Sequence, residues 1–248
     1  MQRVRLRYAK RGRLRFTSHR DFARAFERAL RRAGIPMAYS AGFTPHPKIS
    51  YIGAAPTGVS SEAEYVEIGL ARRMDVEEVR SVLDAALPDG LDLLAAVEAG
   101  PGSLADRIQA GQWRVELSGV SARELSAALE KFLAAEEILV SRLTKDGRRE
   151  INARNAVIWA EAAAPPAADV PDVSVPSAAV NGERAILDLV VRLDTPAVRP
   201  DDVLAALAAV AGLAPSEPPR AVRLAQGPLD GSGRVGDPFA PDSATDAG

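Results

Sequence analysis

The sequence predicts an α+β protein in which short strands and amphipathic helices alternate along the chain. Three observations support this prediction. Segments in which every second residue is apolar indicate strands with one buried face. Segments with apolar residues three and four positions apart indicate helices. The same order of segments occurs twice, in residues 1–99 and again in residues 112–227.

The first half begins with the clearest strand, residues 3–8, in which apolar residues alternate with arginines. Ser18, followed three residues later by Asp21, predicts the start of a helix, and Gly34 predicts its end. The predicted elements, in order, are a strand at 3–8, a helix at 19–33, strands at 49–55 and 64–70, a helix at 76–87 and a strand at 91–97. This β-α-β-β-α-β order is typical of the ferredoxin-like fold, whose helices cover one face of an antiparallel sheet.

The second half follows a connector at 100–111 and repeats this order. Its predicted elements are a strand at 113–117, a helix at 122–135, a hairpin of 138–143 and 149–153 around Asp146-Gly147, a strand at 184–193, a helix at 200–211 and a strand at 221–225. We therefore predict tandem ferredoxin-like domains, residues 1–99 and 112–227. A Pro/Ala-rich insertion at 162–180 is expected to be mobile, and a Gly/Pro/Asp/Ser-rich tail at 228–248 is expected to be disordered.

Composition excludes several classes of site. The chain has no cysteine, which excludes disulfides, zinc–thiolate sites, thiol nucleophiles and an iron–sulfur cluster held by its own thiolates. Two histidines are too few for a histidine-rich metal site, so we expect no metal and no cofactor. No apolar run is long enough to span a membrane, and the basic N-terminal segment lacks the apolar core of a signal peptide. We therefore expect a cytoplasmic protein with no membrane partner.

Charge is distributed unevenly, although the net charge is only −2. Residues 1–50 contain 13 lysines and arginines against two acidic residues, which gives a net charge of +11. Alternation at 3–8 places its arginines on one face, and that face of the sheet is expected to be open. A row of guanidinium groups suits bridging phosphates. We predict that a nucleic acid is bound by Arg3, Arg5, Arg7, Lys10, Arg11, Arg13, Arg15, Arg20 and Arg24.

Two alternatives to this polyanion surface stay open. The arginine face could be solvated and paired with Glu64 or Glu67, and the arginine excess could reflect a GC-rich genome. The helix at 19–33 carries a second basic stripe, for which an ordinary exposed helix face is the alternative: Arg20, Arg24, Arg28, Arg31 and Arg32.

His19 and Asp21 are the candidate catalytic residues, because an imidazole oriented by a carboxylate can act as a general base. The alternative is that Asp21 only caps the helix and that His19 lies at the surface. The proline-containing loop around His46 presents an imidazole, an aromatic ring and an ammonium group. We predict a pocket near the basic face formed by Ser18, His19, Asp21, Phe43, His46 and Lys48.

Three runs resemble a known family. They are K-R-G-R-L-R-F-T-S-H-R-D at 10–21, R-A-G-I-P-M-A-Y-S-A-G-F-T-P-H-P-K-I-S-Y at 32–51 and G-V-S-S-E-A-E-Y at 58–65. This part of the chain resembles the radical-SAM-linked domain family, whose bacterial members are encoded beside a radical SAM protein or fused to one. The resemblance implies a radical SAM iron–sulfur protein as partner.

We therefore expect a non-catalytic accessory protein of a radical SAM modification system, which binds RNA (tRNA or rRNA) or a ribonucleoprotein through its basic N-terminal face. One alternative is an RNA-processing endoribonuclease that uses His19. A second alternative is a protein–protein adaptor that docks on the radical SAM enzyme.

Overall fold

The computed structural model describes residues 1–144, 147–165 and 183–243. Together they form a mixed α/β fold with a mostly sheet core and five α-helices. The chain divides into two compact units. The first contains residues 1–108 and those from 237 onward, and the second contains residues 109–236. None of the helices in the described ranges has the length and apolar character needed to cross a membrane.

The first unit is built on an antiparallel sheet of order β4-β1-β3-β2. Its strands are β1 (Gln2–Lys10), β2 (Ile49–Ile52), β3 (Ser60–Leu70) and β4 (Leu93–Glu98). Arg5 of β1 lies opposite Glu67 of β3 on one side and Val97 of β4 on the other. The four predicted strands of this half are therefore present in the predicted chain order.

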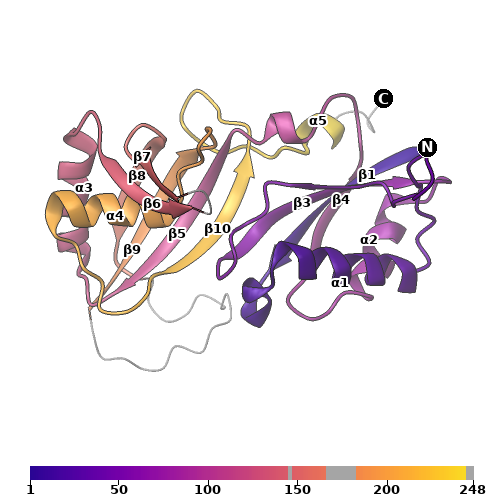
Figure 1. Ribbon diagram of the computed structural model, residues 1–248, viewed down its shortest axis with the longest axis horizontal. Coiled ribbons are helices and arrows are strands. Elements are labelled where there is room, and N and C mark those ends of the chain that lie inside the picture. Colours follow the sequence, from indigo (N-terminus) through magenta and orange to yellow (C-terminus); the bar gives the residue numbers. More distant parts are fainter. Residues whose placement is uncertain (145–146, 166–182, 244–248) are drawn as a thin grey trace. The chain divides into compact units, whose positions relative to one another are not determined.

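Two helices cover one face of this sheet, as Figure 1 shows: α1 (His19–Arg32) and α2 (Val76–Asp84). Ser18 caps α1 by accepting a hydrogen bond from the backbone N–H of Asp21, and Gly34 after the helix has a φ of +67°. Both ends of this helix agree with the prediction. Its apolar stripe packs with the even-numbered apolar residues of β1 into one core, and a short 3-10 helix, η1 (Gly12–Phe16), precedes it.

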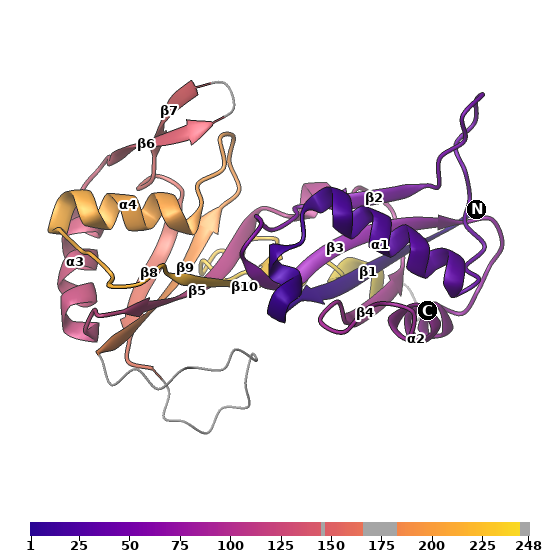
Figure 2. The same ribbon diagram turned by 60° about the horizontal axis from the view of Figure 1, so that its bottom comes forward.

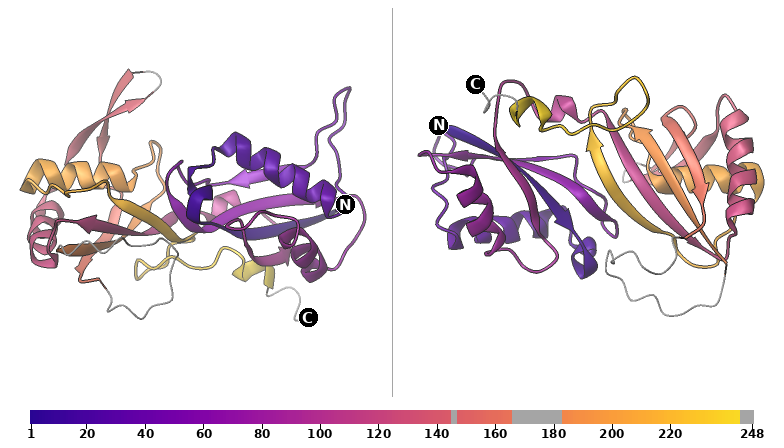
Figure 3. Two further views of the ribbon diagram at one scale, coloured as in Figure 1. Left: turned by 90° about the horizontal axis from the view of Figure 1, so that it is seen from below. Right: turned by 180° about the vertical axis from the view of Figure 1, so that it is seen from behind.

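The opposite face of the same sheet is also covered, and this corrects the predicted disordered tail. Residues 237–243 lie on that face and end in the short helix α5 (Ala240–Ser243), as Figure 3 shows. Phe239 and Asp242 are buried, and Phe239 packs with Leu104 beside the 3-10 helix η2 (Ala105–Arg107). The polar composition of 228–248 predicts disorder, but two buried side chains anchor this part of it. Residues 244–248 lie outside the described residues.

In the second unit, four antiparallel strands pair in the order β10-β5-β9-β8. The strands are β5 (Ala110–Ser118), β8 (Val157–Ala163), β9 (Arg184–Arg192) and β10 (Arg220–Gly227). Helices α3 (Ala122–Ala134) and α4 (Pro200–Ala211) lie on one face of this sheet (Figure 1). A complete capping box, formed by Ser121 and Glu124, starts α3.

The predicted hairpin of the second half exists, but it is separate from this sheet. Among the described residues, strands β6 (Leu139–Thr144) and β7 (Gly147–Asn152) pair only with each other, and they stand apart from the sheet strands in Figure 2. The place beside β9 is taken by β8, which the sequence does not reveal because it is rich in alanine and lacks alternation. Residues 145–146 of the hairpin turn, and residues 166–180 of the predicted insertion, lie outside the described residues.

Candidate nucleic-acid interface

Arg5, at the centre of the predicted arginine face, is not available to an external ligand. Its side chain is 0% exposed, and its Nε donates to Glu67 over 2.9 Å. Its Nη1 donates to both carboxylate oxygens of Asp242, over 2.8 and 2.7 Å, and its Nη2 donates to the carbonyl of Gly102 over 2.6 Å. The expectation of an open arginine face is therefore wrong at this position, because the segment 237–243 covers it.

The flanking arginines of β1 are also partly occupied. Arg3 pairs with Glu67 over 3.3 Å and remains 41% exposed. Arg7 is half-buried, and its Nε finds no hydrogen-bond partner among the described residues. Pairing with Glu67, one of the two acids named as the alternative, thus accounts for Arg3 and for part of Arg5.

Lys10 and Arg11, at the end of β1, are held by neighbouring groups. Lys10 is buried, and its ammonium group lies near the carbonyls of Ala55 and Pro56, at 3.5 and 3.4 Å. Arg11 pairs with Glu62 and, over 2.8 Å, with Asp92, and these contacts raise its pKa. Both residues stabilise the fold around the end of β1.

Exposed arginines gather instead on η1 and α1. Arg13 is exposed, and Arg15 stacks its guanidinium group on the Phe16 ring, 4.5 Å from the centroid. On α1, five arginines are exposed, and no carboxylate of a described residue lies within 4 Å of any of them; four of the five share one face of the helix. We call these four the α1 stripe: Arg20, Arg24, Arg28 and Arg31.

The α1 stripe follows from the helical period. At 100° per residue, the four arginines fall within about 80° of the helix circumference, opposite the apolar residues that face the core. Successive arginines of the stripe lie about 6, 6 and 4.5 Å apart along the helix axis. The predicted phosphate ligands Arg20 and Arg24 belong to this stripe, and Arg28 and Arg31 extend it.

His19 lies at the start of α1 and is exposed. Its ring contacts Tyr51 edge-on, with centroids 5.1 Å apart. Asp21 accepts a hydrogen bond from the Ser18 hydroxyl over 2.7 Å, so its carboxylate serves the helix cap. Within the described part of the chain, no hydrogen bond joins His19 to Asp21. Burial and the charge of Glu27 raise the pKa of Tyr51, so that its phenol stays protonated.

The remaining predicted pocket residues lie on the connection between α1 and β2, which projects from the unit in Figure 2. Two backbone contacts close its base: Ser40 N–H donates to the carbonyl of His46 over 2.8 Å, and Tyr39 bridges to Pro47. Phe43 near its tip is fully exposed, and His46 and Lys48 are exposed as well. Among the described residues, no hydrogen bond, ion pair or ring contact joins these three to Ser18, His19 or Asp21. The six predicted residues therefore do not form one pocket.

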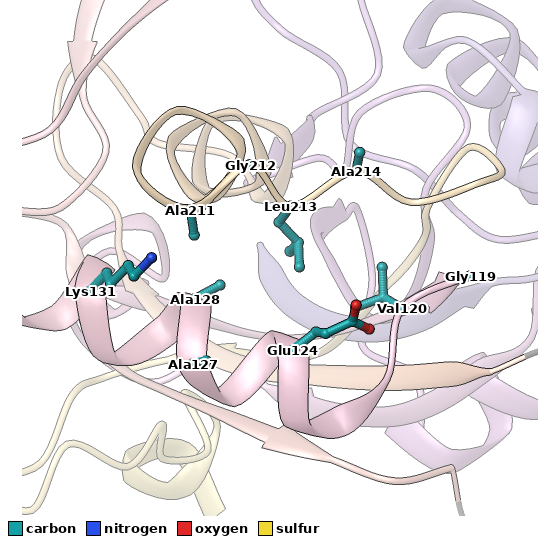
Figure 4. Close-up of a pocket in the computed structure, with 10 residues that line it drawn as sticks. All are labelled: Gly119, Val120, Glu124, Ala127, Ala128, Lys131, Ala211, Gly212, Leu213 and Ala214. Atoms are coloured by element: carbon teal, nitrogen blue, oxygen red, sulfur yellow. The ribbon is translucent and has the colours of Figure 1, made fainter.

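A cavity of about 330 Å³ lies in the second unit, between α3 and α4. Figure 4 shows that its wall consists mainly of small apolar side chains, with Glu124 and Lys131 at its edge. Glu124 is already engaged, because it accepts hydrogen bonds from the hydroxyl and the backbone N–H of Ser121. No predicted site residue lines this cavity. Over the described ranges, no group of three or more histidine, aspartate or glutamate side chains is arranged to hold a metal ion.

Comparison with known proteins identifies the family. The family model DUF2344, described as "Uncharacterized protein conserved in bacteria", matches residues 3–200. The chain belongs to the DUF2344 family. A search of the curated proteins gives no match. The DUF2344 match includes β1, η1 and α1, and hence all the exposed arginines described above, but it ends before the segment 237–243.

Sequence reasoning missed Asp242, Phe239 and Arg107, which together close the sheet face of the first unit. The one signal for them is Phe239, a large apolar residue in an otherwise polar segment. No sequence pattern indicates that this segment folds back on β1.

Proposed function

We propose that this DUF2344 member binds RNA, or a ribonucleoprotein, through the α1 stripe as the non-catalytic accessory protein of a radical SAM modification system. The observation that carries the proposal is the α1 stripe itself: four exposed arginines in one row with no carboxylate partner among the described residues. By contrast, Arg3, Arg5 and Arg11 of the same unit have acidic partners.

Unpaired like charges at helical spacing repel one another, and each such pair destabilises a helix by a few tenths of a kcal/mol. An ordinary exposed helix face avoids this cost with interleaved acids. On α1, Asp21 is taken up by the helix cap, and Glu27 forms no ion pair with an arginine of the stripe among the described residues. A run of phosphates would relieve the repulsion and would fit the planar guanidinium groups.

The radical SAM partner is proposed on the resemblance at residues 7–70 and on the absence of cysteine. A radical SAM enzyme needs thiolate ligands for its cluster, so the iron–sulfur centre would belong to the partner. In this arrangement the DUF2344 chain would hold the RNA while the cytoplasmic partner performs the chemistry.

We also infer a ferredoxin-like arrangement for each unit. The strand orders β4-β1-β3-β2 and β10-β5-β9-β8, each with two helices on one face, support this inference. In the second unit, the β6–β7 hairpin would then be an insertion between α3 and β8.

The test is fluorescence anisotropy with labelled tRNA and rRNA fragments at several salt concentrations. Each phosphate contact to a single strand contributes about −0.7 to the slope of log K against log salt concentration. Replacing Arg20, Arg24, Arg28 and Arg31 by glutamine should therefore make the slope about 2.8 less steep and weaken binding at low salt. The matched control replaces four exposed arginines of the second unit: Arg123, Arg192, Arg220 and Arg234.

The proposal requires that the control variant keep the affinity and salt slope of the wild type. Equal losses in both variants would mean that only net charge attracts RNA. No binding by the wild type at low salt would reject RNA and favour the adaptor alternative. RNA cleavage by His19 has less support, because Asp21 is committed to the cap of α1.

A further inference from the structure

Asp242 is held by a set of donors that fits a carboxylate closely. Arg5 and Arg107 approach it together: Arg107 donates from Nη1 to Oδ2 over 2.9 Å and from Nη2 to Oδ1 over 3.1 Å. The backbone N–H of Gly100 donates to Oδ1 over 3.0 Å. A Cβ at Gly100 would lie 2.8 Å from Oδ1, so the backbone can approach only because this residue is glycine. We call these three groups, Arg5, Arg107 and the Gly100 N–H, the carboxylate clamp.

An apolar recess lies beside the carboxylate clamp and receives Phe239. The Phe239 ring is 3% exposed and meets the Tyr65 ring edge-on at 5.3 Å between centroids. Ile52, Ala63 and Leu104 complete the recess. The occupant therefore contacts the sheet at two points, an aromatic ring and, three residues later, a carboxylate.

The surface and its occupant belong to different parts of the chain. The carboxylate clamp and the recess are formed by residues 5–107, inside the DUF2344 match at 3–200. The occupant, residues 237–243, lies beyond that match. A neighbouring cavity of about 200 Å³, lined by Arg3, Lys48, Ser50 and Glu67, leaves room beside the occupied position.

We propose that this face of the first unit is a peptide-binding surface for segments with an aromatic residue followed three residues later by a carboxylate. In this chain the segment 237–243 fills it, and an acidic segment of a partner protein with the same pattern competes for it. The partner is thus defined by an aromatic residue and a carboxylate three positions later. This surface is distinct from the α1 stripe. This proposal does not depend on RNA binding.

A peptide suits the surface better than a phosphate does. The recess accepts a ring, which a phosphate backbone does not supply at this spacing. The two guanidinium groups grip both oxygens of a planar carboxylate. Glu67, 18% exposed and paired with Arg5, would repel a doubly charged phosphate at the same place. The buried Arg5 guanidinium is thus neutralised jointly by Glu67 and by the incoming carboxylate.

The test uses a fluorescent peptide with the sequence of residues 236–244, GDPFAPDSA, and the full-length chain. In the wild type, the attached segment competes at an effective concentration in the millimolar range. In the Phe239→Ala variant this competition is weakened, while Asp242 still neutralises Arg5. We expect the variant to bind the peptide at least about ten-fold more tightly than the wild type does. Phe43→Ala, which removes a fully exposed ring from the same unit, is the matched control and should bind like the wild type.

Specificity is tested from both sides. A labelled peptide that carries the Phe239→Ala or the Asp242→Asn change should not bind to the full-length Phe239→Ala protein. Adding Arg107→Gln to that protein should abolish its binding of the unchanged peptide. A folded Phe239→Ala variant that binds no more tightly than the wild type would overturn the proposal. A second result would also overturn it: an RNA oligonucleotide displaces the labelled peptide, and neither peptide change alters the affinity of the peptide. The ligand of this surface would then be a phosphate.

A second measurement decides the matter if Phe239→Ala does not fold. In the wild type, the amides of Asp242 and Ser243 donate to the Phe239 carbonyl, over 2.8 and 3.1 Å. Saturating free peptide should release the attached segment and speed hydrogen exchange at these amides. Unchanged exchange at saturation would reject competition for the surface.

Discussion

Replacing Asp242 by alanine should destabilise the first unit by about 3 kcal/mol. Removing one partner of a buried ion pair typically costs about 3–5 kcal/mol, because the other charge is left in a low dielectric. The side chains of Asp242 and Arg5 are both 0% exposed. Arg5 would retain Glu67 and the carbonyl of Gly102, and this residual pairing places the loss at the lower end of that range.

Urea unfolding followed by circular dichroism measures this loss. With a typical urea dependence of about 2 kcal/mol per molar, a 3 kcal/mol loss lowers the midpoint of the first unit by about 1.5 M. Tryptophan fluorescence, recorded in parallel, reports the second unit alone, because Trp113 and Trp159 both lie in it. We expect the fluorescence transition to stay at its wild-type midpoint.

Asp92→Ala is the matched control in the same unit. Asp92 also pairs with an arginine, Arg11, but the two side chains are 42% and 37% exposed. An exposed pair of this kind contributes at most about 1 kcal/mol. If Asp242→Ala costs no more than Asp92→Ala, the reasoning from burial is refuted, and the segment 237–243 is not held by its carboxylate.

Three further predictions concern pH, backbone packing and helix capping. Burial raises the pKa of Asp242, but hydrogen bonds from Arg107, Arg5 and Gly100 outweigh burial and lower it. The Asp242 carboxylate therefore stabilises the folded first unit at pH values above its unfolded pKa of about 3.9, and this stabilisation is lost as the pH falls through the lower folded pKa. The free energy of unfolding of Asp242→Asn should therefore decrease less at acidic pH than that of the wild type. Gly100→Ala should cost about 1–3 kcal/mol and speed hydrogen exchange at 237–243, because its Cβ would lie 2.8 Å from Asp242 Oδ1; wild-type exchange would contradict this. Ser121→Ala removes the capping box of α3 and should cost the second unit about 1 kcal/mol by tryptophan fluorescence, whereas Ser126→Ala, within the same helix, should cost little.

Local patterns predicted most of the secondary structure, because local chemistry determines it. The helix at 19–33 carries its own start signal at Ser18 and its own end signal at Gly34, and α1 begins and ends with them. The strand at 3–8 alternates clearly and lies within β1. By contrast, β8 has no comparable pattern, since it contains three alanines and its apolar and polar residues do not alternate.

The candidate site was harder to predict, because exposure depends on contacts between residues far apart in the chain. Alternation correctly places Arg3, Arg5 and Arg7 on one face, but it cannot indicate that Asp242, 237 residues after Arg5, covers that face. The basic stripe of α1 was recognisable from the 3.6-residue period alone. Its lack of acidic partners among the described residues emerged only from the three-dimensional arrangement.

The route of the chain has a consequence for its synthesis on the ribosome. Residues 1–108 emerge first, yet the face of their sheet that carries Arg5 and Tyr65 receives its cover only from residues 237–243. The 128 residues of the second unit are translated in between, which takes about 6–26 s at 5–20 residues per second. During that interval the nascent first unit exposes an aromatic recess and an arginine that lacks its Asp242 partner. This is the period in which chaperones, or a partner already present in the cell, would find the surface unoccupied.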